Sequence, residues 1–227
     1  DLCEEAYGQD DVLAQLLPDA RLRIGMDVAS ATVFRSRARC RDAALAFVVA
    51  DVRRLPLQTA SVDAVFSNST LDHFRSAEEF TCAVSELARV LRPGGRMIIT
   101  MDNTWNPLYW ILRTASRLKL APFELGYSTS QPGLTAALAD AGLEVVGSRT
   151  LIHNPRLIST LAFLALRRIM GARADGPIRG LLGVFSRMED LPTRRFTACF
   201  VAACATKPAV RQPEATPPAY LRGSALP

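Results

Sequence analysis

Short runs of apolar residues, each followed by polar side chains, recur along the first half of the chain. Residues 47–50 (FVVA) lead into Asp51, residues 64–66 (AVF) lead into Ser67, and residues 97–100 (MIIT) form a third run. Short apolar runs of this kind are typical of strands that are buried on both faces of a parallel sheet. Ligands bind at the carboxyl ends of such strands, so the polar residues there are candidate site residues.

A helix is expected between the second and third runs. Ser76 followed by Glu79 forms a capping box, and apolar residues then recur at helical spacing as far as Leu91. Pro93-Gly94-Gly95 turns the chain into the third run. Strands that alternate with helices predict an α/β, doubly wound sheet.

Further elements follow from the same patterns. Strands are expected at residues 22–28, 143–146 and 196–203, and helices at residues 12–17, 30–41, 130–141, 157–170 and 178–188. From Lys207 onward prolines dominate, so residues 207–227 are expected to form a disordered tail.

Composition favours one domain, residues 1–206, because 227 residues with 49% hydrophobic content can bury one sizeable core. The net charge of +5 comes from scattered arginines, which favours a solvated surface over a nucleic-acid partner. Five widely spaced cysteines and two histidines give no metal-ligand spacing and fit reduced thiols in a cytoplasmic protein.

No apolar run is long enough to span a bilayer, so no stable membrane insertion is expected. Arg167 and Arg168 adjoin the apolar segment 157–166, and this segment could touch a membrane surface. A helical cap over a ligand pocket, formed by residues of about 104–135 and 155–190, is the favoured interpretation.

Four segments in this order and spacing resemble the class I S-adenosylmethionine-dependent methyltransferases of the small-molecule type. They are residues 23–28 (RIGMDV), 50–57 (ADVRRLPL), 61–69 (SVDAVFSNS) and 91–95 (LRPGG). The resemblance implies a Rossmann-like, mostly parallel seven-stranded sheet with an antiparallel last strand and helices on both faces. It also implies S-adenosylmethionine as cofactor and methyl transfer to a small organic, apolar or aromatic acceptor.

One departure from that family lies just upstream of Asp27, where the family has a glycine-rich loop. Here the chain reads Asp1-Leu2-Cys3-Glu4-Glu5, and glutamates do not allow the close backbone approach that glycines do. The chain begins with Asp rather than Met, so a cut or processed start is expected. The departure keeps open an alternative function, a catalytically inactive methyltransferase-like binding domain that has lost the cofactor loop. A nicotinamide dehydrogenase is disfavoured because no Gly-x-Gly-x-x-Gly is present.

The resemblance assigns cofactor contacts to residues at the strand ends: Asp1, Cys3, Asp27, Val28, Asp51, Val52, Ser67 and Asn68. Both hydroxyls of a ribose can donate to the carboxylate of Asp27, although this acid could instead cap the helix that follows. Asp51 is expected to accept from the adenine amino group. Its alternative is an ion pair with Arg53 or Arg54.

His73 is the candidate catalytic base, because imidazole can take a proton near neutral pH. A structural role for His73 at the rim of the site is the favoured alternative. Acceptor contacts are expected from Asp72, Asn103, Trp105 and Tyr109. The aromatic residues among them could equally anchor a helix to the sheet.

Overall fold

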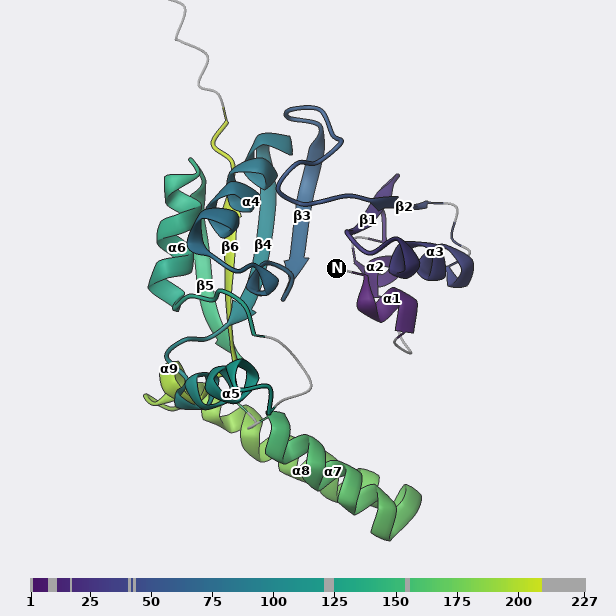
Figure 1. Cartoon of the computed structure of the whole chain (residues 1–227), viewed down its shortest axis with the longest axis vertical. Helices are drawn as coiled ribbons and strands as arrows, with labels where there is room; N and C mark the ends of the chain where they lie inside the picture. Colours follow the sequence, from purple (N-terminus) through teal and green to yellow (C-terminus); the bar gives the residue numbers. More distant parts are fainter. Residues whose placement is uncertain are drawn as a thin grey trace, which may run out of the picture.

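The secondary structure comes from a computed structural model that describes residues 2–7, 12–16, 18–40, 42, 44–120, 125–153 and 156–209 (Figure 1). Its strands are β1 (Arg23–Asp27), β2 (Leu45–Val49), β3 (Val62–Asn68), β4 (Leu91–Asp102), β5 (Glu144–Leu151) and β6 (Phe200–Thr206). Its α-helices are α1 (Cys3–Tyr7), α2 (Val12–Gln15), α3 (Ser30–Arg39), α4 (Ala77–Val90), α5 (Pro107–Arg117), α6 (Gln131–Asp140), α7 (Arg156–Met170), α8 (Asp175–Ser186) and α9 (Arg194–Thr197). Three 3₁₀ turns are η1 (Leu71–His73), η2 (Gly171–Ala174) and η3 (Arg187–Asp190).

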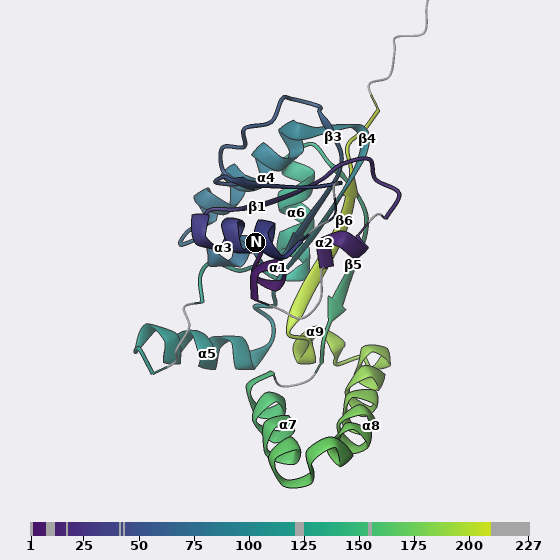
Figure 2. The ribbon, with the colours of Figure 1, turned by 90° about the vertical axis from the view of Figure 1, so that its right-hand side faces the viewer.

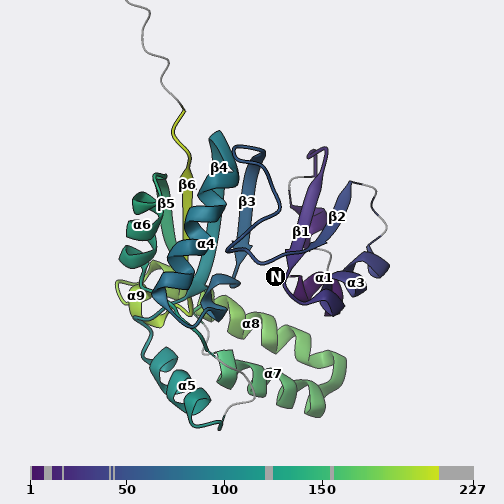
Figure 3. The same ribbon diagram turned by 45° about the horizontal axis from the view of Figure 1, so that its top comes forward.

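The strands form two sheets. The larger has the order β3-β4-β6-β5, and the smaller consists of β1 and β2. Figures 1 and 3 show the β1–β2 pair on the side of β3 that faces away from β4. The α/β fold and the antiparallel last strand are confirmed. A single, mostly parallel sheet of seven strands is not what the described residues form, because they contain six strands divided between two sheets. In the larger sheet only the β3–β4 pair is parallel, since β6 lies between β4 and β5 and pairs antiparallel with both.

The hydrophobic core lies between the larger sheet and the helices α4 and α6, which cover the same face (Figure 2). Met97 and Ile99 of β4 are fully buried beneath them. Side chains alternate along a strand, so the opposite face carries Phe66 and Ile98, which are 43% and 41% exposed. The expectation of helices on both faces is therefore not met for this sheet within the described part of the chain.

Several boundaries differ from the sequence-based expectation. The last strand begins at Phe200, and Phe196 lies in α9 instead. Strand β4 begins at Leu91, ahead of the expected turn, and its pairing with β3 is irregular across residues 92–95. Gly94 has a φ of +78° there, and its amide donates to Lys207 O. The capping box is half formed: Ser76 Oγ accepts from Glu79 N, but the Glu79 carboxylate accepts from Arg75 N.

Lys207 holds the end of β6 against the end of α4. Its Nζ donates to Ala88 O at 2.7 Å and to Leu91 O at 2.8 Å, where the helix leaves carbonyl groups without partners. Residues 210–227 of the expected tail lie outside the described residues.

Glu86 and Arg89 fix the loop that leads from Asp51 back to the sheet. Glu86 Oε1 accepts from Leu55 N at 2.7 Å, and its Oε2 accepts from Arg89 Nε at 2.7 Å. Arg89 Nη2 in turn donates to Leu57 O at 2.9 Å. The hydrogen bonds from Arg89 lower the pKa of Glu86.

Replacing Glu86 should therefore destabilise the fold in a pH-dependent way. Glu86→Gln should lower the free energy of unfolding at pH 7 by about 1–3 kcal/mol, because the hydrogen bonds to a charged acceptor are weakened. Since the folded pKa of Glu86 lies below its unfolded value of about 4.3, the wild-type advantage is complete above that value and is lost as pH falls through the lowered pKa. Urea unfolding at pH 7 and at pH 3 measures both effects.

Asp63→Asn is the matched control for this measurement. Asp63 pairs with Arg92 at 2.7 Å, but the two side chains are 83% and 51% exposed. Exposed ion pairs contribute little, so this change should cost less than about 0.5 kcal/mol. Equal losses in the two variants would contradict the role of Glu86.

Candidate functional site

The carboxyl ends of β3 and β4 are joined by side-chain hydrogen bonds. Thr100 Oγ1 donates to Asn68 Oδ1 at 2.7 Å, and Ser69 N donates to Thr100 Oγ1 at 3.0 Å. These bonds fix the backbone where the chain leaves β3, so Ser67 and Asn68 occupy set positions beside the end of β4.

Asp72 in η1 lies next to these strand ends and is buried, with 5% of its surface exposed. Its Oδ2 accepts from Ser69 Oγ at 2.6 Å and from Asp102 N at 3.2 Å. Its Oδ1 and the Oγ of Ser67 are buried without a hydrogen-bond partner among the described residues. Burial of a polar atom is costly unless it is hydrogen-bonded, so these two atoms are positions that a bound ligand can satisfy.

Asn103 and Asn106 connect the end of β4 to the segment that precedes β6. Asn103, 1% exposed, donates from Nδ2 to Arg195 O at 2.8 Å and to Ala198 O at 3.0 Å. Asn106 Nδ2 also donates to Ala198 O at 3.0 Å. Asn103 Oδ1 accepts from Trp105 N at 3.1 Å. The chain from Asn103 to Asn106 is thus held against α9.

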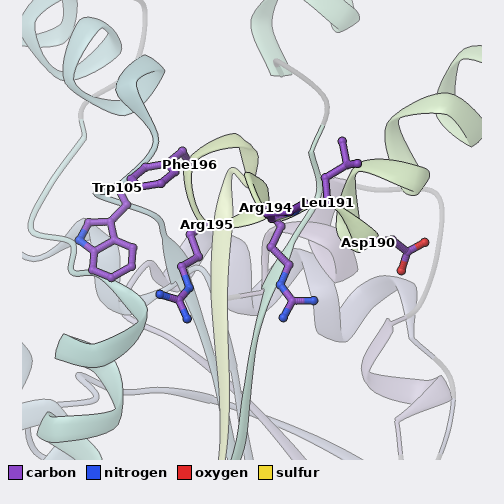
Figure 4. A pocket seen from close by; sticks show the side chains of 7 residues that line it. Trp105, Asp190, Leu191, Arg194, Arg195 and Phe196 are labelled. Carbon is purple, nitrogen blue, oxygen red and sulfur yellow. The ribbon is translucent and has the colours of Figure 1, made fainter.

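A pocket of about 580 Å³ opens beside the segment from Asn103 to Asn106 (Figure 4). It is lined by Trp105, Asp190, Leu191, Pro192, Arg194, Arg195 and Phe196. The rings of Trp105 and Phe196 are stacked with centroids 6.2 Å apart. Figure 4 shows the guanidinium groups of Arg194 and Arg195 extending to the same side of the pocket. An aromatic wall beside two cations suits an apolar or aromatic ligand that carries a negative charge.

The two other predicted residues near these strand ends differ in exposure. His73 is exposed at the end of η1, which favours the rim role over the catalytic one. Tyr109 is 5% exposed, and its hydroxyl donates to Gly126 O at 3.3 Å. Burial raises the pKa of Tyr109. Tyr109 therefore connects α5 to the loop at residue 126.

Asp27 and Val28 lie at the end of β1 in the smaller sheet, apart from Ser67 and Asn68. The Asp27 carboxylate accepts from Ala29 N at 2.8 Å and from Leu2 N at 2.9 Å. Each oxygen keeps a further lone pair for a ligand donor. Val28 is 72% exposed. Asp1 lies outside the described residues, and Cys3 begins α1.

Asp51 is engaged by Arg53, as the second sequence interpretation proposed. Arg53 Nη2 donates to Asp51 Oδ2 at 2.6 Å, and its Nη1 donates to Glu79 Oε1 at 2.6 Å. The guanidinium also lies 5.4 Å from the ring centre of Phe74. The hydrogen bonds from Arg53 lower the pKa of Asp51. Val52, next along the chain, is half-buried.

Glu5 has a structural role that the sequence did not indicate. It is 5% exposed, and its Oε1 accepts from Leu13 N at 2.7 Å, at the start of α2. A glutamate at this position thus fixes one short helix against another, where the resembling family has glycines. The signal that could have found it is the spacing of Glu5 ahead of the apolar segment at residue 12.

His153 is a second buried polar residue that sequence reasoning missed. It is 4% exposed, and its Nδ1 lies 2.8 Å from Thr197 Oγ1, which ties the end of β5 to α9. Burial lowers the pKa of His153, so the folded protein holds the imidazole neutral.

Protonation of His153 at low pH should therefore destabilise the contact between the end of β5 and α9 beside the pocket. The folded pKa of His153 lies below its unfolded value of about 6.5. The contribution of neutral His153 to the free energy of unfolding is therefore fully present above that pH and is lost as the pH falls through the lowered pKa. The urea midpoint should decrease between pH 7.5 and about pH 5 in the wild type, and less so in His153→Gln. His73→Gln, at the exposed histidine, is the control, and a change equal to that of His153→Gln would refute this account.

Within the described ranges, no group of three or more metal-ligating side chains is close enough to hold an ion. In the same ranges, no helix has the length and apolarity needed to cross a bilayer.

Comparison with known proteins places the chain among methyltransferases. Residues 6–99 match the family described as a methyltransferase domain. The chain is 34% identical over 163 residues to a probable S-adenosylmethionine-dependent methyltransferase of Mycolicibacterium smegmatis, covering 68% of this chain and 54% of that protein. It thus spans about half the length of that relative.

Two further proteins are similar. A demethylmenaquinone methyltransferase of Beutenbergia cavernae is 29% identical over 179 residues, covering 68% of this chain and 72% of that protein. The crystal structure of an S-adenosylmethionine-dependent methyltransferase from Methanosarcina mazei matches with a TM-score of 0.59 and 15% identity, covering 91% and 90% of the two chains. At that identity the match bears on the fold alone.

Proposed function

Because the chain belongs to the class I S-adenosylmethionine-dependent methyltransferases, we propose that it transfers a methyl group from S-adenosylmethionine to a small organic acceptor. The observation that carries this proposal is the set of buried polar atoms at the ends of β3 and β4. Ser67 Oγ and Asp72 Oδ1 are without partners among the described residues and adjoin the segment that leads to the aromatic pocket.

The residues at the strand ends fit the chemistry of this cofactor. Asp27 is an acceptor-only group with free lone pairs, which suits hydroxyl donors. Ser67 Oγ can donate or accept, and Asp72 Oδ1 can accept from a hydroxyl or an ammonium group. Asp51 fits less well, because Arg53 already occupies its carboxylate. We assign to Asp51 the role of holding Arg53 in the loop after β2. We assign cofactor contacts to Asp27, Val28, Val52, Ser67 and Asn68.

S-adenosylmethionine supplies a methyl group that is already activated on a sulfonium. The chain's own task is then to orient the acceptor and exclude water, which can lower a barrier without a dedicated base. Asp72 is suited to hold a proton-bearing acceptor atom through Oδ1, because its Oδ2 is fixed by Ser69 and Asp102.

We infer that the acceptor is apolar or aromatic and carries an anionic group. The stacked rings of Trp105 and Phe196 supply the apolar surface. Arg194 and Arg195 supply the positive charge, against a single acid, Asp190, in the same pocket. The likeness to a demethylmenaquinone methyltransferase is compatible with the apolar or aromatic part of this acceptor, whereas the anionic group is inferred from the two arginines alone. Helices α5, α7 and α8 lie at this end of the molecule (Figures 1 and 3). None of the residues that line the pocket belongs to these helices, so a cap formed by them stays a prediction.

Titration with S-adenosylhomocysteine tests the cofactor assignment. We expect saturable one-to-one binding by calorimetry, and a loss of about tenfold or more in Asp27→Asn, because an amide cannot accept from two hydroxyls as a carboxylate does. Asp51→Asn should change the affinity less than about threefold, since its carboxylate serves Arg53.

Either of two results would count against these assignments. Absence of binding to a protein that melts cooperatively would favour the alternative, a methyltransferase-like binding domain without catalysis. A larger loss in Asp51→Asn than in Asp27→Asn would instead restore the adenine role of Asp51.

Turnover should separate Asp72 from His73. With tritiated S-adenosylmethionine and a panel of phenolic carboxylic acids, Asp72→Asn should lower kcat/KM by roughly tenfold or more, because the acceptor loses a charged hydrogen-bond partner. His73→Ala should retain activity within about twofold, since His73 is exposed at the rim. Full activity in Asp72→Asn together with loss in His73→Ala would reverse the two roles.

A further inference from the structure

Helices α7 and α8 form a helical arm, residues 156–186, that projects from the body of the protein. Figures 1 and 2 show the arm beyond the end of the larger sheet, joined at its tip by η2. Its principal backbone contacts are those of α7 with α8, of both helices with η2, and of α8 with η3. The arm therefore presents most of its surface to its surroundings.

The exposed surface of the arm is unusually apolar. In α7, Leu161 and Leu164 are 60% and 61% exposed, and Ile169 is 81% exposed. In α8, Val184 is 57% exposed and Leu182 is 39% exposed. No described residue of α8 is buried. Several large apolar side chains exposed on one projecting element are candidates for contact with a partner or a lipid surface.

The same end of the molecule is basic. The arm contains five arginines and one acid, Asp175, and α5 adds two arginines and no acid. Their net charge of +6 exceeds the +5 of the whole chain, so the remaining residues together carry −1. Figures 1 and 3 show α5 at the same end of the larger sheet as the arm. Positive charge is therefore concentrated beside the exposed apolar residues.

We propose that the arm docks on the surface of an anionic lipid bilayer. Its helices lie in the interface, with the leucine and isoleucine side chains among the acyl chains and the arginines among the phosphates. No described helix is long and apolar enough to cross the bilayer, so docking is peripheral. Exposed aliphatic side chains have no partner on a nucleic acid, and two arms of like charge repel each other, so lipid is the favoured occupant.

Docking would place the acceptor pocket close to the lipid surface. Helix α8 continues through η3, and Asp190 at the end of η3 already lines the pocket with Arg194 and Arg195. An amphiphilic acceptor could then reach the pocket from the bilayer with its charged group facing the two arginines. The docking surface itself does not depend on catalysis, so its test is separate from that of the proposed function.

Co-sedimentation of the full chain with vesicles tests the proposal. We expect binding to vesicles of phosphatidylcholine with phosphatidylglycerol, weaker binding in higher salt, and little binding to phosphatidylcholine alone. Leu161→Ser/Leu164→Ser should weaken the partition coefficient about tenfold or more, because two exposed leucines no longer enter the interface. Leu22→Ser is the control, since Leu22 is 57% exposed but lies outside the arm.

A second pair of variants tests the charge. Arg168→Gln/Arg173→Gln should weaken the partition coefficient about tenfold or more, whereas Arg21→Gln/Arg96→Gln outside the arm should change it less than about threefold. Circular dichroism spectra and melting curves of the arm variants should match those of the wild type. The two leucines and the two arginines that are replaced are all exposed, so their replacement removes little buried contact.

Three results would overturn the proposal. The first is absence of binding to anionic vesicles by the folded wild type. The second is a concentration-dependent dimer, seen by sedimentation velocity, that the leucine variant abolishes, which would make a second copy the occupant. The third is binding to single-stranded RNA at the same salt that exceeds vesicle binding and depends on Arg168 and Arg173, which would make the arm a nucleic-acid surface.

Discussion

The geometry of the candidate site depends on one buried side-chain amide. Asn103 leaves the end of β4 and donates to two carbonyl groups of the segment before β6, while its oxygen accepts from the Trp105 amide. Leaving such groups buried without partners would cost more than the bonds themselves contribute, so the arrangement has few alternatives. The position of Trp105 against α9, and hence the pocket, follows from this constraint.

The two sheets are linked near the proposed cofactor site by weaker interactions. Arg53 holds Asp51, Glu79 and the ring of Phe74, but its side chain is 39% exposed. Exposed ion pairs contribute little to stability, so Arg53 orients the loop after β2 without strongly fixing the smaller sheet. Asp72 is the contrasting case, because it is buried and one of its oxygens has no hydrogen-bond partner in the described part of the chain. The polar centre of the site therefore belongs to the larger sheet.

The proposed chemistry and the proposed docking surface meet in the segment between α8 and β6. This segment supplies Arg194, Arg195 and Phe196 to the pocket, and His153 holds its far end through Thr197. It begins where the arm ends, at η3. A short stretch of chain thus joins a surface suited to lipid to a pocket suited to an apolar anion.

The sequence by itself determined the local elements and the family, because each depends on short-range patterns. Apolar runs of strand length, the cap at Ser76 and the segment order were enough to predict β3, α4 and the polar residues at the strand ends. It did not determine which of those polar residues are free to bind a ligand. Arg53 donates hydrogen bonds to the Asp51 carboxylate, and the Tyr109 hydroxyl donates to Gly126 O. Asp72 Oδ1, by contrast, has no hydrogen-bond partner among the described residues. Only tertiary structure decides this, because hydrogen bonding depends on neighbours that lie far apart in the chain. The same reason explains why the buried roles of Glu5 and His153, and the division into two sheets, were not foreseen.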